Sequence, residues 1–272
     1  MSFEGPPTGL DYYPCRYGKS RLPFRGPRAA LDGRYTVVLG GSETYGKYVE
    51  DPFCDQLAER TGRRVANLGI MNGSVEAFVL DRPLLRVIRA AQVVVVQAMG
   101  AQNLSNRYYT VHPRRNDRFL RHSRQMERLF PEVDFSDFVF TRHMLGALHD
   151  VSPERFATLR RELQATWSAR MRRLLSEIPG QKVMLWIEGV PAHGPWSEPL
   201  FVTLEMMQGL EGQIDKFVHV DVSDLQGDPT LGRMVFPETE RPAARLMMTP
   251  DGHARVAAAL AKAIRRANGM AA

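Results

Sequence analysis

The chain has 272 residues, of which 44% are hydrophobic and 24% are charged, as is ordinary for a globular protein that buries a full core. These proportions exclude a disordered, collagen-like or disulfide-scaffold chain. The formal net charge is +6, and only five of the 36 basic residues are lysines.

The composition also predicts where the protein works. The two cysteines, Cys15 and Cys54, have no metal-ligand spacing, which favours a reduced compartment and no metal site. No apolar stretch approaches the length that crosses a bilayer, and the first residues lack the layout of a secretory signal. We therefore expect a cytoplasmic protein without a membrane span.

Elements of an α/β fold follow one another from residue 35. Residues 1–34 are rich in Pro, Gly, Tyr and Arg, and we expect them to wrap the domain as coil. The patterns that follow predict a strand at 35–39, a helix at 46–60, a strand at 64–68, a helix at 75–89 and a strand at 92–99. The last strand, QVVVVQAM, is a continuous apolar run, typical of burial on both faces of a parallel sheet.

The strand–helix alternation breaks at Gly100. Some fifty residues without a convincing central strand follow, and helices are expected around 118–130 and 138–149. We interpret 101–150 as a helical cap inserted over the carboxyl edge of the sheet. The alternation then returns, with a helix at 153–178, a strand at 183–187, a helix near 200–210, a strand at 217–222 and a last helix beginning at Thr249-Pro250-Asp251. The sequence predicts one three-layer α/β/α domain, residues 35–272, with a mostly parallel sheet.

A glycine-rich turn after the first strand is the sharpest local motif. Gly41 to Lys47 spells G-x-x-x-x-G-K, a phosphate-binding pattern. Tyr48 follows in place of the hydroxyl residue that binds magnesium, so a nucleotide triphosphatase is disfavoured. A metal-independent phosphonucleotide site, as in sulfotransferase-like folds, stays a minor alternative.

The other interpretation makes Ser42 a nucleophile at a strand-to-helix turn. The elbow of α/β-hydrolases, G-x-S-x-G, is not satisfied because Thr44 holds its last position. Three blocks suggest another superfamily: Gly41-Ser42 after the first strand, Asn67-Leu68-Gly69-Ile70-Met71-Asn72-Gly73 after the second, and Gly100-Ala101-Gln102-Asn103 after the third.

In their order and spacing these blocks resemble the SGNH/GDSL hydrolases. The whole chain also resembles an uncharacterised bacterial family of unknown function with the phrases GGSETYG, GAQN-SNR-Y and VHPRRNDRF. The superfamily resemblance implies a serine esterase or O-acyltransferase without a cofactor, acting through an acyl-serine intermediate.

The resemblance assigns roles residue by residue. Ser42 would be the nucleophile, Gly73 or else Gly69 an oxyanion amide, and Asn103 the side-chain oxyanion donor. Asn103 lies one residue further from Gly100 than the pattern expects, so Gln102 is an alternative. The structural alternatives are a helix N-cap for Ser42 and a turn residue for Asn103.

The C-terminal block departs from the superfamily. Its catalytic histidine would fall near Met247 or Met248, and neither side chain accepts a proton. His253 lies one helical turn further on and is one candidate base; His112 and His193 are the others. The sequence does not choose among them.

An arginine-rich segment suggests the substrate class. Residues 101–130 hold seven arginines against Asp117 and Glu127, and arginine suits carboxylate, phosphate or sulfate. With the cap over the sheet edge, we expect substrate contacts from His112, Arg114, Arg115, His193 and Trp196. An anionic or carbohydrate-linked ester is therefore predicted, with Trp196 as a sugar-stacking platform.

Two other functions stay open. A domain that lost its base would bind an anionic glycan or another ligand without turnover, as the methionines at 247 and 248 suggest. Nucleic-acid binding through 107–128 is disfavoured, because no known module is recognisable and the charge excess is modest.

Overall fold

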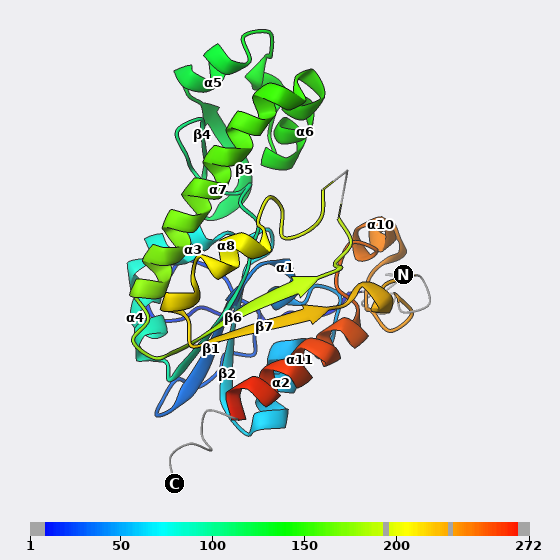
Figure 1. The fold of residues 1–272 in the computed structure, drawn as a ribbon. Helices are drawn as coiled ribbons and strands as arrows, with labels where there is room; N and C mark the ends of the chain where they lie inside the picture. The colour runs from blue at the N-terminus through cyan, green and yellow to red at the C-terminus, as the bar shows by residue number, and fades with distance from the viewer. Residues whose placement is uncertain (1–8, 193–195, 228–230, 266–272) are drawn as a thin grey trace.

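A five-stranded parallel sheet forms the centre of the computed structural model, which describes residues 9–192, 196–227 and 231–265 (Figure 1). The strand order is β2-β1-β3-β6-β7, and every neighbouring pair is parallel. This is the doubly wound order whose ligands bind beyond the carboxyl ends of the strands. The strands are β1 Tyr35–Gly40, β2 Arg64–Gly69, β3 Val93–Gln97, β6 Gln181–Glu188 and β7 Lys216–Asp221.

Alternating side chains of the central strands build two cores. On β3, Val94 and Val96 pack on one face of the sheet while Val93 and Val95 pack on the other. Helices α3 (Val75–Leu80), α4 (Arg82–Ala90) and α7 (Pro153–Ser176) contribute to the first core, and α2 (Phe53–Thr61) and α11 (Pro250–Arg265) to the second. The predicted three-layer α/β/α fold with a mostly parallel sheet is confirmed.

The cap stands beyond the carboxyl edge of the sheet (Figure 1) and contains an antiparallel hairpin as well as helices. Its elements are β4 Tyr109–His112, β5 Arg115–His122, α5 Arg124–Leu129 and α6 Thr141–Val151. The prediction of a helix from residue 118 is therefore wrong for 118–122. The side chain of His112 closes the hairpin, because its Nδ1 accepts the N–H groups of Arg114 and Arg115 at 3.2 and 3.1 Å.

The helix expected at 46–60 is also divided. Helix α1 (Ser42–Tyr45) ends at Gly46, whose φ is 71°, and Tyr48 is left-handed too, with φ 68°. Left-handed residues stop a helix, so α2 starts anew after Pro52. The described residues also form the short helices α8 Leu204–Gln208 and α10 Arg241–Ala244, with 3₁₀ turns at Phe135–Asp137, Glu211–Gln213, Ser223–Leu225 and Glu238–Glu240.

The described part of the N-terminal segment, residues 9–34, forms no helix and pairs through a single bridge between Cys15 and Phe24. Tyr17, Leu22 and Phe24 nevertheless pack into the first core. Among the helices that the structure describes, none combines the length and the apolarity needed to cross a membrane.

Candidate active site

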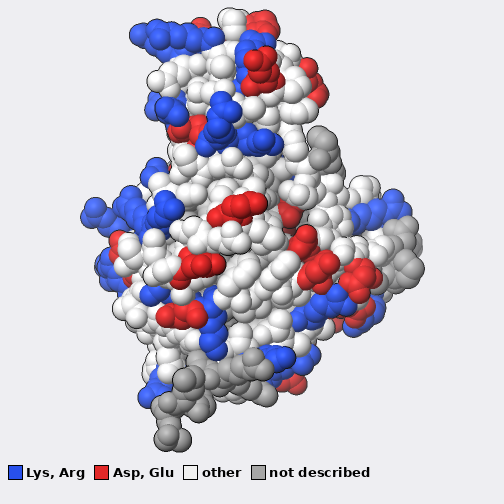
Figure 2. Space-filling view, in the orientation of Figure 1, with Lys and Arg blue, Asp and Glu red and all other residues white. Residues whose placement is uncertain are grey.

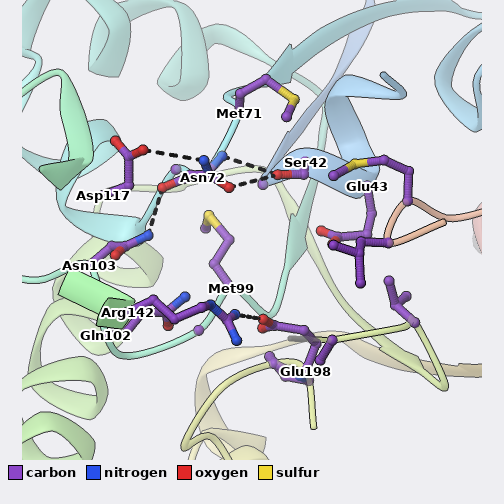
Figure 3. A pocket seen from close by; sticks show the side chains of 18 of the residues that line it. Ser42, Glu43, Met71, Asn72, Met99, Gln102, Asn103, Asp117, Arg142 and Glu198 are labelled. Atoms are coloured by element: carbon purple, nitrogen blue, oxygen red, sulfur yellow. Dashed lines mark hydrogen bonds and ion pairs between the residues drawn. The ribbon is translucent and has the colours of Figure 1, made fainter. Parts of the chain in front are cut away.

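A cavity of about 580 Å³ opens at the carboxyl edge of the sheet, where the loops that follow β1, β2 and β3 meet (Figure 3). Ser42 and Glu43 follow β1 into this cavity, and Asn72 follows β2. The loop after β3 adds Gln102, and the cap adds further wall residues: Asp117, Phe140, Thr141 and Arg142. Parallel strands thus bring chain segments that are far apart in sequence to one edge.

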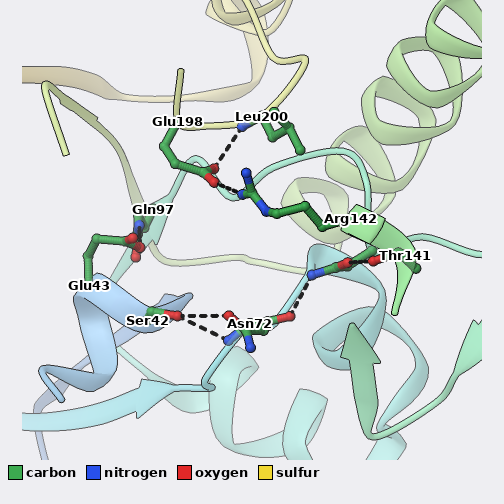
Figure 4. Close-up of polar contacts among 9 residues, drawn as sticks. Ser42, Glu43, Asn72, Gln97, Thr141, Arg142, Glu198 and Leu200 are labelled. Atoms are coloured by element: carbon green, nitrogen blue, oxygen red, sulfur yellow. Dashed lines mark hydrogen bonds and ion pairs between the residues drawn. The ribbon is translucent and has the colours of Figure 1, made fainter. Parts of the chain in front are cut away.

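Ser42 is the first residue of α1 and lines the cavity. Its Oγ accepts the backbone N–H of Asn72 at 3.1 Å and donates to Asn72 Oδ1 at 3.4 Å (Figure 4). The hydroxyl does not cap the helix, because Gly41 is the N-cap residue and no side-chain capping bond is made.

Asn72 brings its backbone amide to the serine because it is left-handed, with φ 53°. Asparagine is among the few non-glycine residues that adopt this conformation readily. Gly73, which the resemblance singles out, also lines the cavity, but its N–H donates to the carbonyl of Ile70 at 2.8 Å. The amide in contact with Ser42 is therefore that of Asn72 rather than that of Gly73.

Asn103 also lies at the cavity, with 3% of its surface exposed. Its Nδ2 donates to the carbonyl of Asn72 at 2.9 Å, and its Oδ1 accepts the hydroxyl of Thr141 at 2.6 Å. Both ends of the side-chain amide are thus engaged within the protein. Asn103 holds the loop after β2 and links it to α6.

Gln102 differs from Asn103 in this respect. It lines the same cavity and is 9% exposed, and its Oε1 is buried without a hydrogen-bond partner. Within the described residues its side-chain amide makes no hydrogen bond. The amide that is available to a bound molecule therefore belongs to Gln102, the alternative that the sequence spacing left open.

The structure does not bring His253 to Ser42. His253 is 1% exposed, its ring stacks on Phe53, and its Nδ1 accepts the Phe53 N–H at 3.1 Å. Burial, and secondarily the charge of Arg25, lower the pKa of His253 to about 3. His253 is thus a core residue between α2 and α11, and the hypothesis that it is the base is not supported.

The position that the resemblance gives to the histidine is occupied by methionine at the cavity itself. Met247 lines the cavity, while Met248 packs in the second core. Among the described lining residues there is no histidine. His193 lies outside the described residues, directly after Pro191 and Ala192, which both line the cavity.

The other predicted substrate contacts lie elsewhere. Arg114 and Arg115 are exposed in the hairpin turn that His112 closes, and none of the three lines the cavity. Trp196 is not a cavity residue either, since its ring stacks on Phe156 with centroids 5.5 Å apart and contacts Phe201. The tryptophan thus serves packing between the cap and the body.

Sequence reasoning missed a polar wall made by Glu43, Gln97, Arg142 and Glu198. Gln97 Oε1 accepts the Gly41 N–H at 3.0 Å, and Gln97 Nε2 donates to Glu43 Oε2 at 2.5 Å. Arg142 of α6 forms an ion pair with Glu198 (Figure 4). Two signals in the sequence could have found part of this wall: a glutamate directly after the serine, and a glutamine that ends an apolar strand.

Burial gives Glu43 an unusual carboxyl group. Loss of contact with water raises the pKa of Glu43, the Gln97 hydrogen bond lowers it, the nearby Glu198 raises it and Arg142 lowers it. In the described part of the chain, no group of three or more His, Cys, Asp or Glu side chains is arranged to hold a metal ion.

The fold and site define an α/β/α protein with a serine at the carboxyl edge of a parallel sheet. More particularly, the chain belongs to the family of a domain of unknown function, DUF6473, whose family model matches residues 1–268. None of the curated protein sequences compared with it matches.

Among solved structures, the chain is similar to Axe2, an acetylxylan esterase from Geobacillus stearothermophilus. The two are 12% identical with a TM-score of 0.46, over 85% of this chain and 94% of Axe2. It is also similar to a family two carbohydrate esterase from Clostridium thermocellum in complex with cellohexaose. The identity is 11% and the TM-score 0.42, over 91% of this chain and 67% of the esterase.

Proposed function

We propose that this protein is a serine ester hydrolase or O-acyltransferase that acts on a carbohydrate-type ester. One observation carries the proposal. The Ser42 hydroxyl lies in the cavity within 3.1 Å of the Asn72 N–H, and the unengaged amide of Gln102 lines the same cavity. A nucleophile beside preorganised hydrogen-bond donors is the arrangement that acyl transfer requires.

The chemistry follows from these groups. Ser42 Oγ attacks the ester carbonyl carbon, and the carbonyl oxygen becomes an oxyanion that the Asn72 N–H and Gln102 Nε2 stabilise. Donors of this kind typically contribute about 3 kcal/mol each. The tetrahedral intermediate then expels the alcohol and leaves an acyl-serine. Water or an acceptor hydroxyl attacks that ester and restores the free serine.

A base must take the serine proton during the attack and return a proton to the leaving alcohol. We propose His193 for this role, because Met247 occupies the expected place and His253 is in the core. Replacement of a general base typically costs about 10²- to 10⁴-fold in rate. His193→Ala is therefore expected to slow acylation of Ser42 by at least about 10²-fold.

The test is covalent labelling of the purified protein by a fluorophosphonate probe. We expect labelling of the wild type, none of Ser42→Ala, and full labelling of Ser136→Ala, an exposed cap serine outside the cavity. Absence of labelling in a folded wild-type protein would refute an activated Ser42.

A second candidate is a binding domain without turnover. The observation in its favour is Met247, which lines the cavity where the resemblance expects the base. This candidate predicts no labelling of the wild type and the appearance of labelling in Met247→His. The first candidate predicts labelling that does not depend on that substitution.

A further inference from the structure

The charges on the cavity wall do not match the arginine-rich composition of the chain. Figure 2 shows Lys and Arg side chains on the cap and over the body, with acidic side chains among them on both parts. The described lining residues include three acids, Glu43, Asp117 and Glu198, and two bases, Lys47 and Arg142. The cavity is thus not a basic site.

Both bases are already paired with carboxylates. Lys47 Nζ lies 3.0 Å from Glu240, and Arg142 forms its ion pair with Glu198. An anionic substrate would have to compete with these carboxylates for each cation. The wall is therefore unsuited to the anionic ligand expected from the sequence.

Within the described residues, Glu43 forms its side-chain hydrogen bond with a neutral group, and Arg142 acts on it only through its charge. Its hydrogen-bond partner is Gln97 Nε2, and the orientation of that amide is fixed because Gln97 Oε1 accepts from Gly41 N–H at 3.0 Å and from Thr44 Oγ1 at 2.6 Å. Asp117 likewise accepts from a neutral amide, Asn72 Nδ2, at 3.3 Å. Both carboxylates are at least partly exposed to the cavity, and within the described residues neither has a cation as its hydrogen-bond partner. Such carboxylates favour a ligand that supplies a positive charge.

The cavity also holds an unpaired acceptor outside this acidic set. In the described part of the chain, Gln102 Oε1 is buried and has no hydrogen-bond partner, and about nine-tenths of the residue is removed from solvent. Buried polar atoms are nearly always hydrogen-bonded, so an exception in a residue that lines a cavity marks that residue as a candidate contact for a bound molecule. Gln102 Oε1 lies against Gly100, so Nε2 is the end of this amide that we assign to the ligand.

We infer that the cavity binds an ester whose alcohol portion is a polyol with a protonated amine, and that Glu43 pairs with this amine. An ammonium group offers three donors and one positive charge, which matches the unpaired acceptors of the wall. The inference deepens the proposed function and rests on it in taking the ligand to be the substrate of Ser42. The amine site itself does not depend on turnover.

Calorimetric titration of the Ser42→Ala protein tests the inference with three monosaccharides of similar size, namely glucosamine, glucose and glucuronate. Hydrogen bonds to charged groups predict that glucosamine binds about tenfold or more tightly than glucose. Glucuronate should bind weakest. Equal affinities for glucosamine and glucose, a preference for glucuronate, or no binding of any of the three would overturn the inference.

A second set of variants isolates Glu43 in the same background. Glu43→Gln should lose the preference for glucosamine, whereas Glu43→Asp keeps the charge and should retain a preference. Glu59→Gln, an exposed substitution on α2, is the matched control. A preference that survives Glu43→Gln refutes the assignment. Binding of glucosamine without fluorophosphonate labelling of the wild type would refute the Ser42 chemistry alone and leave the amine site standing.

Discussion

Replacement of His253 by glutamine tests whether this histidine is a structural residue of the core or a catalytic residue. The ring is buried and accepts the Phe53 N–H at 3.1 Å through Nδ1. Glutamine retains an acceptor oxygen but cannot titrate. Because burial lowers the pKa of His253 to about 3, the folded protein keeps this side chain neutral at every pH above that value.

The expected size of the effect follows from linkage. The ordinary pKa of histidine is 6.5, so between that value and about 3 the unfolded chain binds a proton that the folded chain does not. The stability that neutral His253 provides is therefore complete above pH 6.5 and is lost as the pH falls toward 3. One pKa unit corresponds to about 1.4 kcal/mol, which gives a loss of about 2 kcal/mol at pH 5.

Asp55 partly masks this loss in the wild type. Burial raises the pKa of Asp55 from 3.8 to about 6, against the opposing charge of Arg25 and with a further rise from Asp51. A carboxyl whose folded pKa is raised gains stability as the pH falls below that value, and because Asp55 is exposed, water screens much of this gain. The Asp55 contribution is common to wild type and variant, so it cancels in their difference.

The assay is urea unfolding of wild type and His253→Gln at pH 8 and pH 5. The wild type is expected to be the more stable at pH 8, and its advantage should shrink by about 2 kcal/mol at pH 5. His143→Gln, an exposed cap variant, should show no such change. An advantage that is the same at both pH values, or loss of Ser42 labelling in folded His253→Gln, would refute the core assignment.

Three further outcomes are expected. Asn72→Gly should be more stable than Asn72→Ala by about 1 kcal/mol in thermal unfolding, because a side chain other than Asn strains the left-handed backbone at φ 53°; equal stabilities would contradict that conformation. Gln102→Met should leave the thermal stability unchanged and slow fluorophosphonate labelling of Ser42 by about 10²-fold, which is the loss in rate expected from removing one oxyanion donor. An unchanged labelling rate would show that Gln102 is not part of the site. Arg114→Ser combined with Arg115→Ser should change neither labelling nor glucosamine affinity, because both side chains lie outside the cavity; a tenfold loss in either would place the hairpin turn at the ligand.

The sheet was predictable because strands that are buried on both faces appear in the sequence as continuous runs of apolar residues. The predicted strand at 92–99 contains β3, whose five residues are all buried. The strands β1 and β2 were predicted in the same way, from their apolar residues. The hairpin strand β5 was not, because its sequence RNDRFLRH is largely charged and only Asn116 and Phe119 are buried. Such a strand depends on its partner β4 and on the turn closed by His112, which are features that periodicity does not report.

The loops that line the cavity were predictable from the ends of the strands, whereas the contacts made within each loop were not. Ser42 was identified from its place after β1, and it does line the cavity. After β2, the choice between Asn72 and Gly73 depends on a single positive φ. The backbone conformation of one residue decides which amide contacts the serine, and the pattern of residue types in a single sequence does not contain that information.

The polar wall shows why net charge was a poor guide to the ligand. Glu43, Arg142 and Glu198 come from three distant segments and meet only in the folded chain. The excess positive charge of the chain lies largely outside the cavity, and its field is screened beyond about 8 Å at physiological salt. Glu43 acts at contact distance, where screening is weak. The charge that selects a ligand is therefore the unpaired charge inside the cavity, whatever the sum over the surface.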